Sequence, residues 1–452
     1  MDNCAQSLAS SSSSPASWGT SSPVTTPELS DDGFDIDRPP SPFGGGGSID
    51  GTDWTDGASP TFILVIGGLG YIGSHTVLEL LREGYNVCIV DNLGNSFDSV
   101  LINIKTLIAR HCREKGSSVP LIHFHRLDYR SRSMRFLLDS YSDVVRIKDA
   151  SGKQRLTYRS RIAGVIHFAA YKSVAESITE PLRYYQNNVC GLVTLLQRLN
   201  HYGIHNFIFS SSATVYGAMA SAGLPLREDN LLHQPEEIVD EEVAARQPSG
   251  PMGLTCPYAR SKYFAEAILA DTAAANPAWR IVALRYFNPV GCDPSGLLGE
   301  NPRAEATNLY PVIAQVLTGT RPRLDVFGSD WSTRDGTAVR DFVHVLDVAR
   351  GHISALAWNA AQKPAKSGIG RFRAFNLGSG SGTTVLEAVQ SLEAAAGRSI
   401  PLNLTGRRPG DVGFCVASSE RAQKELGWFP RESVGQCAKD LWNYLQRERG
   451  MA

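Results

Sequence analysis

The fold is decided by the stretch Gly67-Gly68-Leu69-Gly70-Tyr71-Ile72-Gly73. An apolar run, residues 61–66, precedes this stretch, and a run with helical patterning, residues 74–81, follows it. A second apolar run, residues 85–90, ends at Asp91, 18 positions after the last glycine. Strand, glycine-rich turn, helix, strand and acidic residue, in that order, are typical of a dinucleotide-binding site.

The glycines have separate physical roles in such a site. Gly67 permits the tight turn, Gly70 lets the backbone approach a pyrophosphate, and Gly73 lets the helix pack closely on the strand. The N-terminus of the helix then presents unpaired N–H groups and the positive end of its dipole to the phosphates. Asp91 can accept hydrogen bonds from both ribose hydroxyls of the adenosine. Because its charge would repel a 2′-phosphate, we expect NAD rather than NADP.

The composition bounds the class of protein. The 452 residues predict two domains, and the shares of hydrophobic (42%) and charged (20%) residues are ordinary for a globular protein. No apolar run approaches the ~18–20 residues that span a membrane, and the N-terminus lacks a signal-peptide pattern. Eight scattered cysteines without metal-ligand spacing predict reduced thiols and no metal site. We therefore expect a cytoplasmic protein that binds neither a membrane nor, since it has no basic stripe with interleaved aromatics, nucleic acid.

Residues 1–58 differ from the rest, because they are rich in Ser, Pro, Thr and Gly, and we predict that they form a disordered tail. This tail carries nine acidic residues and one basic residue, a net charge of −8 against −1 for the whole chain. The remainder therefore carries about +7, which suits a phosphate-bearing substrate, although solubility alone is an equally simple explanation.

Strand-like and helix-like runs alternate from Thr61 onward, which predicts a parallel sheet covered on both faces. We expect an α/β fold, a doubly wound Rossmann sheet over residues 59–288, followed by a smaller mixed α/β substrate-binding domain over residues 289–452. The predicted strands are 61–67, 86–91, 121–126, 164–168, 206–211 and 281–286, and the predicted helices between them are 71–83, 98–115, 131–139, 181–201 and 257–275. The second domain is expected to hold helices at 308–318, 383–396, 419–426 and 433–446, and a strand at 372–378 could return to the first domain. Residues 143–161 and 227–253 are polar or rich in Pro and Gly, and both are predicted to be surface loops.

Tyr258 and Lys262 form a second motif. They are four residues apart on a predicted helix, so they share one face. An ammonium group near a phenol favours the phenolate, so Lys262 is expected to lower the pKa of Tyr258 from about 10 and make it a proton acceptor near neutral pH. Ser212 follows a predicted strand at the edge where ligands bind, and its hydroxyl could share the substrate oxygen with the phenol. A tyrosine and a lysine at this spacing also occur on ordinary helix surfaces. It is their combination with the glycine turn that points to short-chain dehydrogenase/reductase chemistry.

From Thr61 to about Tyr444 the chain resembles the UDP-glucose 4-epimerases, a group of extended short-chain dehydrogenase/reductases. Seven stretches carry this resemblance in order: Gly67–Thr76, Asp91–Ser96, Val165–Val174, Phe207–Gly217, Arg285–Gly291, Gly336–Val345 and Arg408–Asp411. The tail and the two predicted loops fall outside it. The resemblance implies NAD as cofactor, a UDP-hexose as small-molecule substrate, and interconversion of UDP-glucose and UDP-galactose by transient oxidation at sugar C4, a step of galactose metabolism.

The resemblance also implies roles for individual residues. The catalytic residues would be Ser212, Tyr258 and Lys262. The cofactor-binding residues would be Gly67, Gly70, Tyr71, Ile72, Gly73, Asp91, Asn92, Asn95, Ser96, Asp128, Tyr129, Phe168, Ala169, Ala170, Lys172, Asn187, Tyr258, Lys262 and Tyr286. The substrate-binding residues would be Lys172, Ser212, Ala213, Thr214, Tyr258, Asn288, Asn308, Leu309, Phe327, Arg340, Arg408, Asp411 and Cys415. No metal is implied.

Cys415 stands where members confined to plain hexoses carry tyrosine, and a small residue there accompanies acceptance of N-acetylated sugars. The resemblance therefore suggests that UDP-N-acetylglucosamine and its galactose isomer are also interconverted, unless Cys415 only fills space. It further implies a homodimer that pairs the helices near 181–201 and 257–275, although the apolar faces of these helices could equally belong to the core of one chain.

Three alternatives remain. The first is a UDP-pentose 4-epimerase or another NAD-dependent nucleotide-sugar enzyme on the same scaffold. The second is a 4,6-dehydratase, but such an enzyme would be expected to carry an acidic residue where Ala213 and Thr214 stand. The third is a non-catalytic NAD-binding protein, against which the presence of Ser212, Tyr258 and Lys262 argues, although fold alone does not establish function.

Overall fold

The computed structural model describes residues 60–148, 152–233, 253–303, 305–362, 371–408, 411–448 and 450. The predicted disorder of residues 1–58 lies outside these residues, as does most of the second predicted loop.

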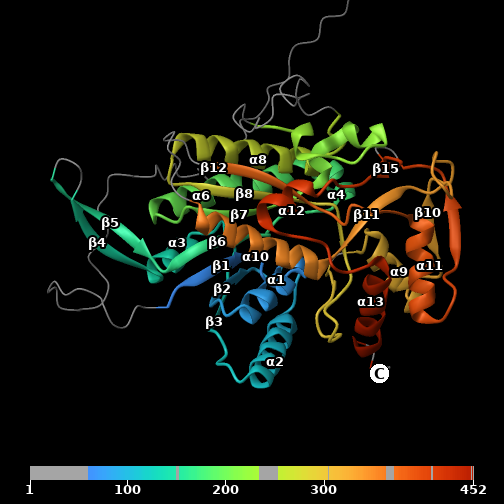
Figure 1. The fold of residues 1–452 in the computed structure, drawn as a ribbon, viewed down its shortest axis with the longest axis horizontal. Coiled ribbons are helices and arrows are strands. Elements are labelled where there is room, and N and C mark those ends of the chain that lie inside the picture. Colours follow the sequence, from blue (N-terminus) through green and yellow to red (C-terminus); the bar gives the residue numbers. More distant parts are fainter. Residues whose placement is uncertain are drawn as a thin grey trace, which may run out of the picture. The chain divides into compact units, whose positions relative to one another are not determined.

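A sheet of seven parallel strands lies at the centre of the fold (Figure 1). Its order is β12-β8-β7-β6-β1-β2-β3, so the chain starts within the sheet and winds outward in both directions, as predicted for a doubly wound fold. The strand predicted to return to the first domain is confirmed as β12, which pairs with β8 along its whole length. The strands are β1 (Phe62–Ile66), β2 (Val87–Asp91), β3 (Ile122–Arg126), β6 (Ile162–His167), β7 (Asn206–Ser212), β8 (Arg280–Tyr286) and β12 (Arg371–Leu377).

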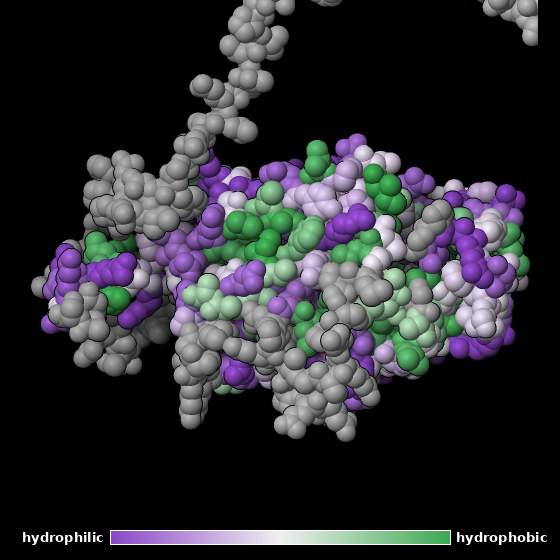
Figure 2. All heavy atoms as spheres, turned by 90° about the horizontal axis from the view of Figure 1, so that it is seen from above, coloured by the Kyte–Doolittle hydropathy of each residue, from purple (hydrophilic) through white to green (hydrophobic). Residues whose placement is uncertain are grey.

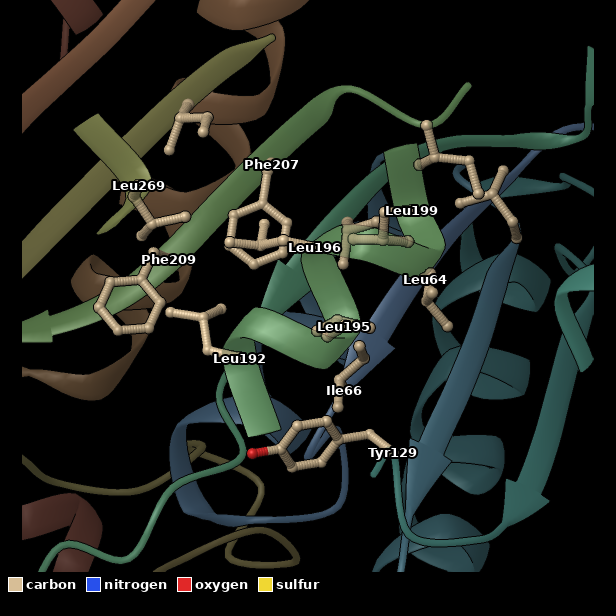
Figure 3. Packing of buried hydrophobic residues seen from close by; sticks show 14 of the residues in the cluster. Leu64, Ile66, Tyr129, Leu192, Leu195, Leu196, Leu199, Phe207, Phe209 and Leu269 are labelled. Carbon is tan, nitrogen blue, oxygen red and sulfur yellow. The ribbon is translucent and has the colours of Figure 1, made fainter. Parts of the chain in front are cut away.

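Helices cover both faces of the sheet because its strands are apolar on both sides. In β1, Leu64 and Ile66 point into one buried cluster, while Ile63 and Val65 point into the other. The first cluster is closed by α3 (Ser133–Ser140), α6 (Gly191–His201) and α8 (Pro257–Ala275), and Figure 3 shows leucines of α6 packed on β1 and β7. The second cluster is closed by α1 (Tyr71–Arg82), α2 (Asp98–Lys115) and α10 (Val345–Ala361). Helix α10 was not predicted, although it packs into this second cluster on one face of the central sheet.

Two predictions about the first half were wrong. Residues 143–161 are not a loop, because β4 (Ser142–Lys148) and β5 (Gln154–Ser160) pair as an antiparallel hairpin. Its sequence is polar because both faces of a two-stranded ribbon meet water. The helix predicted over 181–201 is interrupted: α5 (Pro181–Tyr185) and α6 are separated by a π-helical turn, η1 (Gln186–Cys190). A short helix that was not predicted, α4 (Val174–Thr179), precedes α5.

The later part of the chain builds a third buried cluster around small sheets and helices. Strand β11 pairs with β9, β13 and β15, while β10 pairs with β14. The four helices predicted here are confirmed with shifts of at most two residues at their ends. The elements are β9 (Asn288–Val290), β10 (Leu324–Phe327), β11 (Val339–His344), β13 (Gly382–Thr384), β14 (Leu402–Thr405), β15 (Phe414–Cys415), α9 (Leu309–Leu317), α11 (Val385–Ala396), α12 (Glu420–Leu426) and α13 (Val434–Glu448), with 3₁₀ segments η2 (Ala213–Ala222) and η3 (Glu228–Asn230) before them.

The turn between β1 and α1 depends on two of its glycines. Gly67 has φ 78°, in the left-handed region, and a Cβ atom there would lie 2.8 Å from the backbone nitrogen of Ala169. A Cβ atom on Gly73 would lie 2.3 Å from the carbonyl oxygen of Gly67. Because both obstructing atoms belong to the backbone, side chains at 67 and 73 would force the turn apart.

We predict that Gly73→Ala destabilises the protein by about 1–3 kcal/mol, the usual range for overpacking a tight contact. Chemical denaturation measures this change in the free energy of unfolding. The matched control is Gly435→Ala in α13, where an added Cβ meets only the Ser433 hydroxyl at 3.7 Å. The control is expected to keep the stability of the parent or to gain up to about 1 kcal/mol from helix propensity. Equal stabilities for the two variants would contradict the close approach at Gly73.

Candidate active site

A cavity of about 1210 Å³ opens at the carboxyl ends of the central strands. Ligands of open α/β sheets bind at this edge. The cavity continues between the sheet and the later part of the chain, where β10, β11 and the start of α9 line it. Every residue assigned from the sequence to the cofactor or to catalysis lines this cavity. Of the residues assigned to the substrate, Ala213 and Cys415 do not line it.

At one end of the cavity lie the glycine turn and the carboxylate of Asp91. Gly70 caps α1 without a side-chain hydrogen bond, so the first N–H groups of the helix remain available to an anion. Asp91 ends β2, and three donors fix its carboxylate: the N–H groups of Leu69 (3.0 Å) and Leu93 (2.9 Å) and the hydroxyl of Ser96 (3.0 Å). Leu93 adopts φ 58°, a strained conformation for leucine, in the turn that follows. This end of the cavity therefore offers the N–H groups of α1 to an anion and the fixed carboxylate of Asp91 to hydrogen-bond donors.

Asp128 and Tyr129, expected at the adenine, are already engaged within the protein. Arg130 donates to the Asp128 carboxylate at 2.6 Å, and this bond holds the pKa of that carboxyl below its usual range. The Tyr129 hydroxyl donates to the carbonyl oxygen of Asn187 at 2.6 Å. Both residues therefore contribute fixed walls at this end of the cavity.

The π-helical turn η1 buries two neighbouring asparagines. Asn187 lines the cavity, whereas Asn188 donates from its amide to the carbonyl oxygen of Tyr171 and to the Ser261 hydroxyl, both at 3.0 Å. Asn188 thereby ties the loop after β6 to helix α8. Sequence analysis missed this residue. The one signal was an Asn-Asn pair inside a predicted helix, and π turns of this kind are frequent at functional sites.

Ser212, Tyr258 and Lys262 meet beside this wall. Ser212 ends β7, its hydroxyl accepts a hydrogen bond from the Thr214 hydroxyl at 3.0 Å, and it lines the cavity together with Tyr258. Tyr258 lies in the first turn of α8, which begins at Pro257 after a Cys256 cap. Lys262 follows one turn later, and its ammonium donates to the carbonyl oxygen of Ser210.

The electrostatics differ from the sequence-based expectation. Burial raises the pKa of Tyr258 to about 12, and the hydrogen bond with Ser212 opposes this shift only in part. Burial lowers the pKa of Lys262 to about 7, against the effect of the nearby Glu266 carboxylate. The expected lowering of the phenol pKa by Lys262 is absent from this arrangement, because desolvation dominates and the ammonium is directed at a carbonyl oxygen.

A buried ion pair that sequence analysis missed lies behind this group. Glu266, one turn beyond Lys262, accepts from the Arg285 guanidinium at 2.7 Å and from His233 at 2.9 Å, and also from the Ser211 hydroxyl. Glu266 and Arg285 are both fully buried. Burial alone would raise the pKa of the Glu266 carboxyl, but Arg285 and His233 outweigh it and hold that pKa well below its usual range.

The other end of the cavity carries a pair of arginines. Asp411 accepts from Arg340 at 2.6 Å and from Arg408 at 3.4 Å, so one carboxylate holds both guanidinium groups. The Arg408 guanidinium also lies 4.5 Å from the centre of the Phe327 ring. Asn308 precedes α9 without a side-chain cap, which leaves the N-terminus of this helix free to bind an anion. The arrangement suits a phosphate-bearing group next to a flat ring.

Further assigned residues also line the walls of the cavity. Lys172 donates to Glu300 at 2.8 Å, rather than standing unpaired. The Tyr286 hydroxyl donates to Nε2 of His352, since Nδ1 of that ring donates to the carbonyl oxygen of Val348. Asn288, Leu309, Asn92, Asn95, Phe168 and Ala170 also line the cavity.

Cys415 and Ala213 lie behind the cavity wall. Both pack into one apolar cluster with Phe287. Burial raises the pKa of the Cys415 thiol to about 11, so this thiol is protonated near neutral pH. Cys415 is the register partner of Arg340 in the neighbouring strand. Its size can therefore affect the cavity only by moving its neighbours.

The residues present fit a dinucleotide. The glycine turn lines the cavity, the N-terminus of α1 has no side-chain cap there, and the Asp91 carboxylate is fixed at the strand end. Among the described residues no group of three or more His, Cys, Asp or Glu could hold a metal ion. No helix within the described ranges is long and apolar enough to cross a membrane.

Comparison with known proteins gives the family. Residues 63–378 match the model of the NAD dependent epimerase/dehydratase family. UDP-glucose 4-epimerase 2 of Arabidopsis thaliana is 41% identical over 382 residues, which cover 84% of this chain and 94% of that protein. The structure of UDP-glucose 4-epimerase from Bifidobacterium longum in complex with NAD⁺ and UDP is 35% identical, with a TM-score of 0.70, and the match covers 86% of this chain and 99% of that one. The epimerase of Stenotrophomonas maltophila, with bound NAD and formylated UDP-arabinopyranose, is 36% identical with a TM-score of 0.70, over 87% of this chain and 100% of that one. The chain therefore belongs to the NAD-dependent epimerase/dehydratase family and, within it, to the UDP-glucose 4-epimerases.

Proposed function

We propose that the chain interconverts UDP-glucose and UDP-galactose by transient NAD-dependent oxidation at sugar C4. The observation that carries this proposal is that Ser212, Tyr258 and Lys262 line one cavity together with the glycine turn and the pair of arginines. Family membership supports the same reaction.

The two ends of the cavity have different tasks in this proposal. The glycine turn and Asp91 hold the pyrophosphate and the adenosine ribose of NAD, whose nicotinamide, when bound, accepts a hydride from C4 and gives it back. Arg340 and Arg408 bind the diphosphate of the UDP-sugar by charge-assisted hydrogen bonds, with the N-terminus of α9 beside them. The Bifidobacterium structure, which contains NAD⁺ and UDP together, supports this division.

Tyr258 handles the proton of the sugar 4-hydroxyl. Its phenol and the Ser212 hydroxyl both line the cavity, so a substrate hydroxyl placed between them can hydrogen-bond both groups. The phenol takes the proton during oxidation of C4 and returns it during reduction. Lys262 lies one helical turn away on the same face, and its ammonium is held by the carbonyl oxygen of Ser210 at the end of the strand that carries Ser212. The sugar turns between the two half-reactions, while the arginines keep the nucleotide in place.

The proposed domain division matches the two ends of the cavity, one for NAD and one for the UDP-sugar. We assign NAD binding to residues 59–288 and UDP-sugar binding to residues 289–452. Two elements of the later part, α10 and β12, pack with the first sheet rather than with the third cluster. The second domain therefore sends segments back to the first.

Tyr258→Phe is predicted to lower kcat roughly 10²–10⁴-fold, because it removes the hydroxyl that exchanges the proton. The reaction is measured as conversion of UDP-galactose without added NAD, which also separates an epimerase from a non-catalytic NAD-binding protein. Cofactor released by denaturing the variant should equal that of the parent. Tyr263→Phe, five residues on in the same helix, is the matched control and should keep full activity. A Tyr258→Phe variant with parental kcat would exclude the assigned role.

The substrate range extends, in our proposal, to UDP-N-acetylglucosamine and its galactose isomer. Cys415 is small, and it packs against the apolar cluster that contains Ala213, the residue after Ser212, and Phe287. A larger residue at 415 would push this wall into the cavity. The pentose alternative has a separate observation in its favour, since the Stenotrophomonas structure contains formylated UDP-arabinopyranose.

For Cys415→Tyr we expect kcat/KM on UDP-N-acetylglucosamine to fall at least tenfold, while kcat/KM on UDP-glucose changes less than threefold. The physical reason is that the acetamide needs the volume a tyrosine would displace. Product analysis over a panel of UDP-hexoses, UDP-N-acetylhexosamines and UDP-pentoses gives both values and tests the pentose alternative. Cys415→Ser is the control of similar size. Full activity of Cys415→Tyr on the acetylated substrate would refute the selectivity role.

We further propose a cytoplasmic homodimer that pairs α5 and α8 with the same helices of a second copy. Apolar side chains are exposed on this side of the molecule, with Leu182 80% and Phe264 43% exposed, and Tyr185 of α5 contacts Phe264 of α8. Figure 2, which faces the side on which α8 lies in Figure 1, has a hydrophobic area near its centre. Exposed apolar patches of this kind mark interaction sites.

All seven described cysteines are free, which fits a reducing compartment such as the proposed cytoplasm.

Leu182→Glu is predicted to convert the dimer to a monomer, because a two-fold interface would place the introduced charge in the apolar contact of both copies. Sedimentation or light scattering measures the mass. Ile102→Glu, at an apolar residue 64% exposed on α2, is the control and should leave the mass unchanged. A Leu182→Glu variant with the mass of a dimer would rule out this interface.

A further inference from the structure

A segment of the later part of the chain crosses the NAD end of the cavity. We call residues 296–303 the strap; its residues from Gly296 to Pro302 line the cavity opposite the glycine turn and Asp91. The strap begins at the turn of Asp293, whose carboxylate pairs with Arg82 of α1 at 3.3 Å. The segment just before the strap is also bonded to α13, because Asn443 donates to the carbonyl oxygen of Pro294 at 2.7 Å.

Along its length the strap is bonded to helix α2 on one side of the NAD end and to the loop after β6 on the other. On one side, the Asn103 amide donates to the carbonyl oxygen of Leu297 at 2.8 Å. On the other side, Glu300 accepts from Lys172 at 2.8 Å, in the loop after β6. These bonds hold the strap between α2 and the loop after β6.

The end of the strap is held by one residue, Arg303, through both its backbone and its side chain. Its backbone N–H donates to the side-chain oxygen of Asn95 at 3.0 Å, and its Nε donates to the carbonyl oxygen of Ser96 at 2.8 Å. The guanidinium also lies 4.0 Å from the centre of the Phe97 ring, a cation–π contact. Arg303 thus meets three consecutive residues of the loop that follows β2.

This loop carries the acceptor assigned to the adenosine ribose. The Ser96 hydroxyl donates to the carboxylate of Asp91 at 3.0 Å, so the backbone that Arg303 holds is one hydrogen bond away from that carboxylate. Arg303 does not line the cavity itself. Its influence on a bound nucleotide must therefore act through the Ser96 backbone and through the closed strap.

We propose that Arg303 is a positioning residue that latches the strap to the Asn95–Phe97 loop and thereby slows the release of NAD. Release needs space between the strap and that loop, and this space opens only when the contacts of Arg303 break. The proposal rests on the assignment of NAD to this end of the cavity. It assigns the latch no part in the chemistry, because Arg303 touches neither Ser212 nor Tyr258.

The test measures the dissociation rate of NAD from the intact enzyme. Enzyme loaded with labelled NAD is mixed with excess unlabelled NAD, and the label that stays on the protein is followed by rapid filtration. Arg303→Ala is expected to raise the dissociation rate at least tenfold, with kcat at saturating NAD unchanged within twofold. Phe97→Leu should raise the rate by a smaller factor. The double variant should release NAD no faster than Arg303→Ala alone, because both changes remove the same contact.

Two further variants separate a latch from a general loss of structure. Arg303→Lys keeps the charge but loses the flat guanidinium and its Nε bond, so its release rate should lie between those of the parent and Arg303→Ala. Arg334→Ala removes another exposed arginine, which pairs with Glu387 away from the cavity, and should leave the rate unchanged. A parental rate for Arg303→Ala, or an equal increase for Arg334→Ala, would overturn the latch. A parent enzyme purified without any NAD would overturn the proposed function and the latch together, whereas a loaded parent with an unaltered Arg303→Ala rate would overturn the latch alone.

Discussion

The buried ion pair of Glu266 and Arg285 is the interaction on which the active site depends. Taking two charges out of water is unfavourable, and only a complete set of hydrogen bonds makes such a pair tolerable. Here the set is nearly complete: Glu266 also bonds Ser211 and His233, and Arg285 also reaches the Tyr216 hydroxyl and the carbonyl oxygen of Leu231. The pair and its partners come from β7, α8, β8, η2 and the segment after η3. The pair therefore fixes the helix that carries Tyr258 and Lys262 against the strand end that carries Ser212.

The same pair shapes the electrostatics of the residues proposed to be catalytic. Lys262 is buried, and burial favours its neutral form, while Glu266 one turn away favours the charged form. Arg285 limits how much of the Glu266 charge Lys262 experiences, because it binds that carboxylate directly. The phenol of Tyr258 remains protonated in these surroundings, since burial outweighs its bond with Ser212. The protonation states of Tyr258 and Lys262 are thus governed by desolvation as much as by the tyrosine–lysine spacing.

Much of the fold could be predicted from the sequence, because its strands are apolar on both faces and each is followed by a helical pattern. The glycine turn and Asp91 were recognisable because their spacing is dictated by the geometry of one strand–helix–strand unit. The hairpin of β4 and β5 was missed because a ribbon exposed on both faces has the composition of a loop. The π turn was missed because one extra residue in a helix barely alters its apolar period. Helix α10 lay in the stretch between predicted elements, and its Gly351, which packs against Leu377, weakened the helical pattern.

The candidate site was predictable to a similar degree. Residues on the glycine turn and at strand ends could be assigned because short motifs carry them. Glu266 and Arg285 could not, because charged residues are usually exposed and nothing local marks these two as buried. The pairing of Asp411 with two arginines depends on strands that are distant in sequence. Ala213 and Cys415 were expected to touch the substrate, but they lie behind the wall of the cavity, a distinction that depends on side-chain direction in β15 and η2.

The walls of the cavity are interlocked, which constrains how a sugar could turn inside it. The Tyr71 hydroxyl of α1 donates to the carbonyl oxygen of Gly291 at 2.7 Å, across 220 residues of sequence. Asn359 of α10 bonds Asn206 of β7 at 3.0 Å, and β12 completes the first sheet. A hinge between the two parts would have to break these buried contacts, and close-packed interiors do not deform gradually. Rotation of a bound sugar must therefore be accommodated by free volume around Ser212 and Tyr258, while the two ends of the cavity keep their positions.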